Sequence, residues 1–180
     1  MKIELLHSEI VYQGPAFNIR QDFLRFPDRE QFRIDVVDHR DSVTILPVDQ
    51  HGQVWFIRQY RRPIDRYLLE LPAGVREPGE DPLSNAQREL REEIGMAAGS
   101  LQDIGAFYLA PGYSSEFMHV FLARDLYPAP LPGDADEVIQ IEKKSASEAL
   151  RLAESGELCD SKSLIALFWA KPFLSEQGLI

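Results

Sequence analysis

Three glutamates, Glu89, Glu92 and Glu93, stand close together near the middle of the sequence. On an α-helix, residues three and four positions apart lie on one face, so two or three of these carboxylates would share a face. Like charges at that spacing destabilise an isolated helix by about 0.2–0.5 kcal/mol per pair. A bound Mg²⁺ makes the same cluster of carboxylates favourable, because it takes oxygen ligands, often carboxylates together with substrate phosphates. The spacing predicts either a metal site that acts on phosphates or a solvated charged face, which is the commoner meaning of such a run.

The helix that carries these glutamates has clear boundaries in the sequence. Asp81 is a favourable N-cap, Pro82 occupies the favoured first helical position, and Gly95 is a good C-terminal stop. Apolar residues repeat at three- and four-residue steps, at Leu83, Ala86, Leu90 and Ile94. We therefore predict a helix from Pro82 to Ile94 whose apolar face packs on a sheet, with the glutamates beside that face.

Strands and turns surround this helix, and two further helices close the chain. Strands are predicted from β-branched and aromatic residues at Phe17–Phe26, Phe32–Val37, Val43–Val48, Val54–Gln59, Tyr67–Leu71, Ile104–Ala110, Met118–Ala123 and Val138–Lys143. Helices are predicted from Ser145, in a capping box with Glu148, to about Glu154, and from about Ser161 to Ala170. This order predicts a mixed α/β sandwich with an N-terminal β-strand segment, rather than a regular parallel βαβ array.

Charge and composition restrict the class of protein. The 180 residues are 44% hydrophobic and 27% charged, which suits a globular protein with a sizeable core. The net charge of −10 disfavours binding to nucleic acid, whose phosphates it would repel. The lone cysteine, Cys159, excludes an internal disulfide, and no apolar run approaches the ~20 residues that span a bilayer. With no signal-peptide pattern either, we expect a soluble cytoplasmic protein that binds neither nucleic acid nor membrane.

The fixed spacing extends well beyond the three glutamates. Gly74 is followed at set offsets by Glu80, Arg88-Glu89-Leu90, Glu92-Glu93, Gly95 and the apolar Met96. This pattern resembles a complete Nudix box, with no departure at any specified position. The resemblance implies a Nudix-type α/β/α sandwich with a mixed sheet, in a single domain over residues 1–180. Its N-terminal β segment would cover about 1–40 and its catalytic core about 41–180.

The resemblance also implies roles for the residues of the box. Glu89 and Glu93 would be the main metal ligands, and Glu92 would support them or bind a further ion. Arg88 would orient the carboxylates through charge-assisted hydrogen bonds, and Glu80 would be a structural or outer-sphere carboxylate. The catalytic residues of the box would thus be Arg88, Glu92 and Glu93. The cofactor would be Mg²⁺, with Mn²⁺ able to substitute.

The segment that enters the box resembles that of ADP-ribose and nucleoside-diphosphate-sugar pyrophosphatases. It implies the Ala73 carbonyl as a backbone metal ligand, with Gly74 allowing a close approach, and it includes Glu70 as a substrate-binding candidate. Arg58 and Arg61 belong to the densest basic patch of this acidic chain, and arginine binds phosphate through two hydrogen bonds. Arg61 resembles a substrate-phosphate arginine of the group. An edge strand blunted by charge is the alternative explanation of the patch.

A Pro/Gly loop follows the box. Pro111 lies 16 positions after Gly95, and a proline at about this distance is a mark of the ADP-ribose group. Pro111, Gly112 and Ser115 can form a tight loop that presents hydroxyl and backbone N–H groups to a substrate, although an ordinary hairpin turn has the same composition. Candidates for stacking on a base are Phe17, Trp55 and Tyr113, although aromatic residues more often belong to the core.

Two acidic segments beyond the box are candidates for catalysis. Glu116 resembles a carboxylate near the metals in this group, and the resemblance implies it as a further metal ligand. Glu137 lies where the group places a mobile glutamate that activates water, with Asp136 or Glu116 as alternatives for this general base. A solvated acidic turn explains the stretch around Glu137 equally well.

The resemblance therefore predicts a metal-dependent hydrolase that cleaves ADP-ribose to AMP and ribose 5-phosphate. The alternatives are another nucleoside diphosphate sugar, of the GDP-mannose type, a dinucleotide such as a flavin dinucleotide, and a nucleotide-sensing module without catalysis. The complete box argues against the sensing module. In the ADP-ribose group the N-terminal strands are exchanged between two subunits, and this implies a homodimer for the β-rich first 40 residues.

Overall fold

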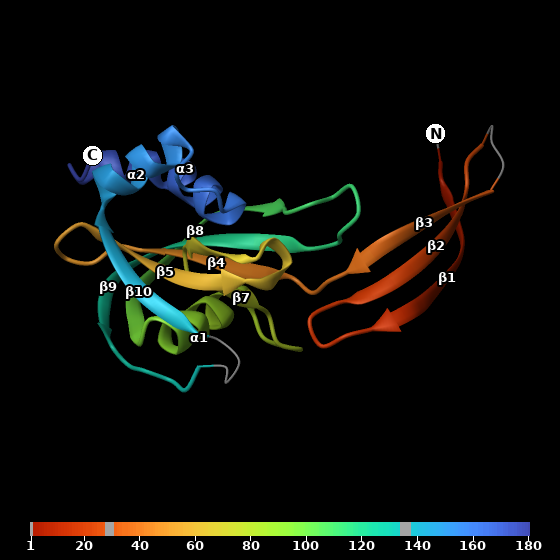
Figure 1. Cartoon of the computed structure of the whole chain (residues 1–180), viewed down its shortest axis with the longest axis horizontal. Helices are drawn as coiled ribbons and strands as arrows, with labels where there is room; N and C mark the ends of the chain where they lie inside the picture. The colour runs from red at the N-terminus through yellow and green to blue at the C-terminus, as the bar shows by residue number, and fades with distance from the viewer. Residues whose placement is uncertain (1, 28–30, 134–137) are drawn as a thin grey trace. The chain divides into compact units, whose positions relative to one another are not determined.

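Strand β4 (Ser42–Pro47) lies at the centre of a sheet, and every one of its residues is buried. A strand that is buried on both faces needs apolar side chains throughout, and Val43, Ile45 and Leu46 supply them. In the computed structural model, which describes residues 2–27, 31–133 and 138–180, the chain divides into two compact units (Figure 1). The larger unit comprises Ser42–Ala106 and Met118–Ile180, and the smaller comprises Met1–Asp41 and Phe107–Phe117.

Two sheets form the middle layer of the larger unit. One has the strand order β7 (Ala73–Val75), β4, β9 (Phe117–Pro128) and β8 (Met96–Tyr108). Because β4 pairs antiparallel with β7 and parallel with β9, this sheet is mixed. The other has the order β10 (Ile139–Ser145), β5 (Gln53–Arg61) and β6 (Arg66–Glu70), with a 3₁₀ turn, η1 (Arg62–Ile64), between β5 and β6.

Helices cover both sides of this layer (Figure 1). On one side α1 (Pro82–Glu93) packs on β4 and β7. On the other side α3 (Ser161–Glu176) packs on β4, and α2 (Ala146–Ser155) packs on β5 and β10. The core beneath α1 consists of Val43, Ile45, Ile57, Ala86, Leu90, Ile94, Ala98, Phe121 and Ala123. The predicted α/β/α sandwich with a mixed sheet is confirmed.

The smaller unit is an antiparallel meander of β1 (Glu4–Gln13), β2 (Asn18–Arg25) and β3 (Gln31–Asp38). The segment Phe107–Phe117 joins it at the end of β3. There the Val37 N–H donates to the Tyr113 carbonyl at 2.7 Å, and the Ser115 N–H donates to the Val37 carbonyl at 3.0 Å. The predicted β-rich N-terminus is therefore present.

Helix α1 follows the sequence prediction closely. Asp81 Oδ1 accepts hydrogen bonds from two N–H groups of the first turn, at 3.0 and 3.1 Å, and Gly95 has a left-handed φ of 69° past the last turn. The predicted apolar face is buried at Ala86, Leu90 and Ile94. The prediction is wrong for Leu83, which is 51% exposed because it lies in the first turn, beyond the core cluster.

Several other elements differ from the predictions. Strand β1 was given no bounds of its own within the predicted N-terminal β segment, because most of its residues are exposed and polar residues interrupt the apolar ones. Strand β8 begins at Met96 rather than Ile104, since the small residues at its start carry little strand preference. Helix α3 continues past Ala170 to Glu176, through Pro172. The proline lacks the N–H that would donate to the Phe168 carbonyl one turn earlier. Within the described residues, no helix is both long and apolar enough to cross a bilayer.

Candidate active site

The glutamate face of α1 lies directly against β7. A Cβ atom placed on Gly74 would come within 2.0–2.3 Å of the Glu89 carboxylate, a distance that no real contact allows. Glu89 itself is only 7% exposed. The glycine at the start of the box is therefore needed for space, because any side chain there would displace the carboxylate of Glu89.

Burial changes the acidity of Glu89. Loss of solvent raises the pKa of its carboxyl group to about 7, although the neighbouring charge of Arg88 lowers it, and the like charge of Glu92 adds to the rise. Asn85, fully buried one turn earlier, donates from Nδ2 to Glu89 Oε1 at 3.1 Å. The Oδ1 atom of Asn85 has no hydrogen-bond partner among the described residues.

Arg88 is shared by three carboxylates. Its Nε and Nη2 atoms donate to Glu80 at 3.1 and 3.2 Å, and its Nη1 atom lies 2.7 Å from Glu92 and 2.8 Å from Glu89. Nη2 also donates to the Val75 carbonyl at 3.1 Å, so the arginine ties α1 to the end of β7. Burial disfavours the charged form of Arg88, but the bonds to Glu80 and the surrounding negative charges raise its pKa above its usual range. The same bonds outweigh burial at Glu80 and lower its pKa.

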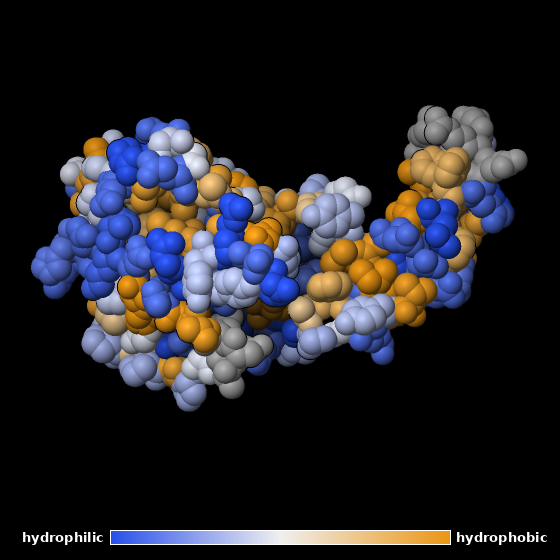
Figure 2. Space-filling view, in the orientation of Figure 1, coloured by the Kyte–Doolittle hydropathy of each residue, from blue (hydrophilic) through white to orange (hydrophobic). Residues whose placement is uncertain are grey.

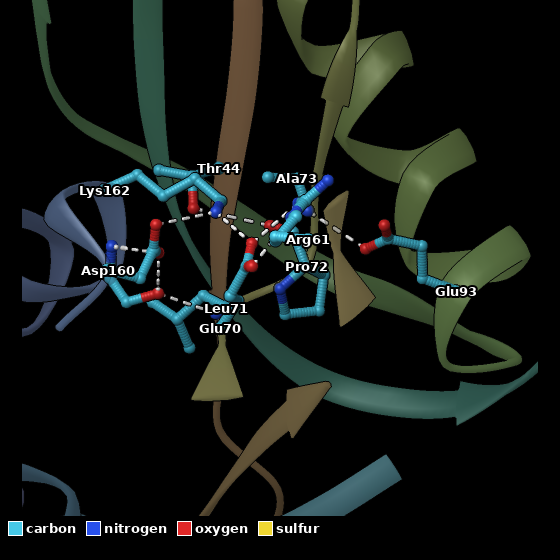
Figure 3. Close-up of polar contacts among 10 residues, drawn as sticks. Thr44, Arg61, Glu70, Leu71, Pro72, Ala73, Glu93, Asp160 and Lys162 are labelled. Atoms are coloured by element: carbon cyan, nitrogen blue, oxygen red, sulfur yellow. Dashed lines mark hydrogen bonds and ion pairs between the residues drawn. The ribbon is translucent and has the colours of Figure 1, made fainter. Parts of the chain in front are cut away.

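Glu93 completes the contact between α1 and β7. It is 7% exposed, and its Oε2 atom accepts the Ala73 N–H at 2.9 Å (Figure 3). The structure thus brings together Ala73, Glu89, Glu92 and Glu93, the residues of the box and its entrance for which metal binding is predicted.

A divalent cation suits this arrangement chemically. A buried carboxylate with a raised pKa is short of positive charge, and a cation that prefers oxygen ligands can replace the proton. In the described part of the chain, no three acidic, histidine or cysteine side chains already surround one point where an ion could sit. Arg88, Asn85 and the Ala73 N–H engage the carboxylates instead. Holding an ion therefore requires some of these side chains to turn from their present partners.

Two predicted substrate residues lie in a buried ionic network beside this contact. Glu70 is 1% exposed, and Arg61 donates to its two oxygens from Nε and Nη2 at 2.8 and 2.7 Å (Figure 3). Lys162 donates to the same carboxylate and to Asp160 Oδ1, the latter at 2.9 Å. Burial alone would raise the pKa of Glu70, but the bonds and charges of Arg61 and Lys162 bring it below its usual range. Both oxygens of Glu70 are therefore bound by protein groups.

Arg58 occupies a more open position on β5. It pairs with Glu142 of the neighbouring strand β10, and this hydrogen bond raises the pKa of Arg58. Its side chain remains 37% exposed.

The predicted residues of the loop after the box belong to the smaller unit. Ser115 Oγ accepts the His39 N–H at 2.9 Å and donates to the His39 carbonyl at 3.1 Å, so its hydroxyl holds the end of β3. Glu116 is 15% exposed and lies 3.9 Å from His39 Nδ1. A Cβ atom on Gly112 would meet nothing within 4 Å. The candidate base Glu137 and its alternative Asp136 lie at 134–137, outside the described residues.

A pocket of about 500 Å³ lies elsewhere in the larger unit, and among the described residues none of the predicted metal ligands lines it. Val48 borders it, whereas Gly74 pairs with Val43, so the pocket and the glycine that opens the box lie towards opposite ends of β4. Trp55 lines this pocket, and Lys143 Nζ already lies over its ring at 3.5 Å from the centroid. Stacking of a base on that face of Trp55 would require Lys143 to move.

Sequence reasoning missed four polar residues in or near the box: the buried Asn85, Lys162 and Ser163, and the largely buried Asp160. Asp160 and Ser163 carried one local signal, the three-residue spacing typical of an N-cap. Lys162 carried none, because a lysine at the start of a helix is normally solvated.

Comparisons with known proteins agree with this geometry. The sequence matches the family model of the NUDIX domain over residues 38–164. It is 34% identical over 162 residues to an ADP-ribose pyrophosphatase of Bacillus subtilis (strain 168), covering 89% of this chain and 88% of that protein. It is 31% identical over 185 residues to a GDP-mannose pyrophosphatase of Yersinia enterocolitica, covering 95% and 96%. A solved structure, the crystal structure of an ADP compounds hydrolase, superposes with a TM-score of 0.88 at 28% identity, covering 100% of this chain and 98% of that one.

The box geometry, the sandwich fold and these matches agree, and the chain belongs to the Nudix family as a Nudix hydrolase.

Proposed function

We propose that this Nudix hydrolase cleaves the diphosphate of ADP-ribose to AMP and ribose 5-phosphate, with Mg²⁺ as its cation. The observation that carries the proposal is the contact of α1 with β7, where Glu89 and Glu93 are buried against Gly74 and Ala73. Buried acids at one contact are costly unless protons or cations neutralise them. The similarity to an ADP-ribose pyrophosphatase and to an ADP compounds hydrolase supports an ADP-containing substrate.

Bound Mg²⁺ would neutralise diphosphate oxygens and lower the pKa of a water molecule. In this proposal Glu89, Glu92 and Glu93 hold the cation together with the Ala73 carbonyl, and Arg88 keeps the carboxylates in place. The attacking water loses a proton to a general base, its oxygen bonds to one phosphorus, and the bond from that phosphorus to the bridging oxygen breaks. Glu137 is the proposed base, with Asp136 and Glu116 as the alternatives.

Recognition of the substrate is proposed for Arg58, Arg61 and the loop after the box. Glu70 fixes the Nε and Nη2 edge of Arg61, yet the arginine side chain remains 39% exposed, which leaves part of it for a phosphate. Glu70 therefore acts on the substrate through Arg61 in this proposal. In the loop, Pro111, Gly112 and Ser115 are the proposed substrate-binding residues.

A second copy of this chain is the proposed partner. The strand register of the meander aligns Leu5, Leu24 and Phe32 across the three strands, with Ile34 on the same face. Leu5, Phe32 and Ile34 are 57%, 44% and 45% exposed, and apolar residues are plain on the surface of this unit (Figure 2). Exposed apolar strand surface of this kind is normally covered by another chain. Sedimentation should give a dimer that Ile34→Asp dissociates; a monomer at every micromolar concentration would contradict the proposal.

A panel of diphosphates tests the substrate. The purified protein is incubated with ADP-ribose, GDP-mannose and a flavin dinucleotide, with Mg²⁺ or Mn²⁺, and the products are identified by mass. We expect the highest kcat/KM for ADP-ribose, with equal amounts of AMP and ribose 5-phosphate. A clear preference for GDP-mannose would favour the second candidate, which the similarity to a GDP-mannose pyrophosphatase supports. Cleavage of none of the three would reject both.

A further inference from the structure

The backbone just before the box, at residues 71–73, is anchored at three successive residues. The Ala73 N–H donates to Glu93, and the Pro72 carbonyl accepts the Ile45 N–H of the neighbouring strand at 2.9 Å. The third anchor comes from a distant part of the chain: the Leu71 N–H donates to Ser163 Oγ at 2.7 Å (Figure 3). Leu71 and Ser163 are both fully buried, so water cannot replace this bond.

The hydroxyl of Ser163 is held in one orientation. Asp160 is the N-cap of α3, and its Oδ2 atom accepts both the N–H and the O–H of Ser163, the former at 3.1 Å. Because the hydroxyl proton points to Asp160, a lone pair of Ser163 Oγ is directed to the Leu71 N–H. The capping carboxylate thus fixes the acceptor as well as the helix end.

Lys162 connects the capping residue Asp160 to Glu70, the residue that precedes Leu71. Its ammonium group lies between Asp160 and Glu70, and Glu70 in turn binds Arg61. Two carboxylates and two cations form this cluster, so its charges balance. Without Lys162, the carboxylates of Glu70 and Asp160 would have Arg61 as the only remaining cation of the cluster.

We propose that Ser163 and Lys162, at the first turn of α3, are positioning residues that hold Glu70–Ala73 in the place catalysis requires. They touch neither reacting atoms nor the box itself, and they act through Leu71 and Glu70 on the Ala73 backbone and so on Glu93. The proposal rests on the assignment of Ala73 and Glu93 to the active site. Some residues do not bind the metal but hold its ligands in position. Removing such a residue typically lowers metal affinity or activity by about 10–100-fold.

The most specific test is Ser163→Ala, which removes the acceptor of the Leu71 N–H and leaves every charge in place. The matched control is Ser161→Ala, at the exposed first position of the same turn. Amide hydrogen exchange of Leu71 and Ala73, measured without metal or substrate, reports the positioning directly. We expect both amides to exchange at least 10-fold faster in Ser163→Ala, with the Leu90 amide of α1 unchanged and Ser161→Ala like wild type.

The kinetic part separates positioning from folding. With the best substrate of the panel, Ser163→Ala should lower kcat about 10–100-fold, leave KM within 2-fold and raise the Mg²⁺ concentration for half-maximal rate. Lys162→Met should act in the same direction, Lys162→Arg should restore most of the rate, and Lys171→Met, at an exposed ion pair on the same helix, should have no effect.

The outcomes distinguish this proposal from the proposed function. If Ser163→Ala keeps wild-type exchange at Leu71 and Ala73, the positioning role is rejected whatever the substrate. Faster exchange with unchanged kcat and metal dependence also rejects it, since the segment would then be anchored for stability alone. If the wild-type protein cleaves no diphosphate, the proposed function is rejected, and so is a catalytic role for Ser163 and Lys162. If Lys162→Met does not fold, the Ser163→Ala variant alone still tests the positioning role.

Discussion

Glu89 and Glu70 are both buried glutamates of the larger unit, and their surroundings change their acidity in opposite directions. At Glu70, two cations outweigh the effect of burial and lower the pKa. At Glu89, burial prevails and raises the pKa to about 7, because Arg88 must also serve Glu80 and Glu92. Glu70 has two cations, Arg61 and Lys162, whereas Glu89 shares the single cation Arg88 with Glu80 and Glu92.

The two sites differ in the number of cations that the protein provides for each buried carboxylate. The Glu70 cluster has one cation for each acid, so it needs nothing from solution and can hold the backbone rigidly. The Glu89 site has one arginine for three acids, so positive charge is missing where the proposed substrate would bring further negative charge. A divalent cation supplies that charge. Substitutions at the two glutamates should therefore have opposite effects on the free energy of unfolding.

The largest expected effect follows from replacing Glu89 by Gln. We expect a loss of kcat of at least about 10³-fold, about 4 kcal/mol, because a ligand of the cation disappears. The free energy of unfolding should stay equal or rise, since a neutral amide replaces a buried charge that is poorly compensated. Steady-state kinetics and urea unfolding measure the two. If Glu89→Gln is fully active, Glu89 is not a ligand of the cation. If it is strongly destabilised, Glu89 stabilises the fold as Glu70 does.

Replacing Glu70 by Gln, unlike replacing Glu89, should lower the stability of the protein. We expect a loss of about 3 kcal/mol in the free energy of unfolding, because Arg61 and Lys162 lose the carboxylate that neutralises them in a buried place. Urea unfolding at neutral pH measures it. The matched control is Glu154→Gln, which breaks an exposed pair with Lys171 and should change stability by less than about 0.5 kcal/mol. Equal effects of the two variants would show that burial of the Glu70 cluster contributes nothing.

Adding one methyl group at Gly74 should affect both activity and packing. Gly74→Ala forces the Glu89 carboxylate to move, and a displacement of about 1 Å near reacting groups can lower a rate about 10²-fold. Overpacking adds a destabilisation of about 1–3 kcal/mol. The control for activity is Gly156→Ala at the end of α2, because its new Cβ meets no atom within 4 Å. If both variants keep full activity, the contact of Gly74 with Glu89 has no functional role.

The smallest expected effect is a change of stability with pH at Glu70. Its folded-state pKa lies below its ordinary value of 4.5, so its ionised form stabilises the protein fully above that pH. As pH falls below 4.5 and through the lower folded-state value, the carboxylate becomes protonated in the folded state too and the contribution disappears. The stability gap between wild type and Glu70→Gln should therefore narrow in unfolding experiments at pH 7, 5, 4 and 3. A gap that stays constant would assign the stabilisation to packing rather than charge.

The sequence predicted local features well and distant contacts poorly. Helix α1 was predicted almost to the residue, because its cap, its stop and its glutamate spacing are local signals. The bond between Leu71 and Ser163 joins residues 92 positions apart, and neither residue type predicts the other. Strand β1 was given no bounds of its own because its exposed residues need no apolar pattern within the chain. Leu83 shows the limit of periodicity. The apolar repeat predicts which face of a helix is buried, but not how far along the helix the sheet covers that face.

The most direct test of the central claim is hydrolysis of ADP-ribose by wild type and by Glu93→Gln, in protein stripped of metal and then given Mg²⁺. The wild-type protein should be inactive when stripped, should produce AMP and ribose 5-phosphate after Mg²⁺ is added, and should exceed Glu93→Gln in rate by at least about 10³-fold. Turnover that survives a chelator, or that persists in Glu93→Gln with added Mg²⁺, would contradict the assignment of the reaction to the glutamate helix.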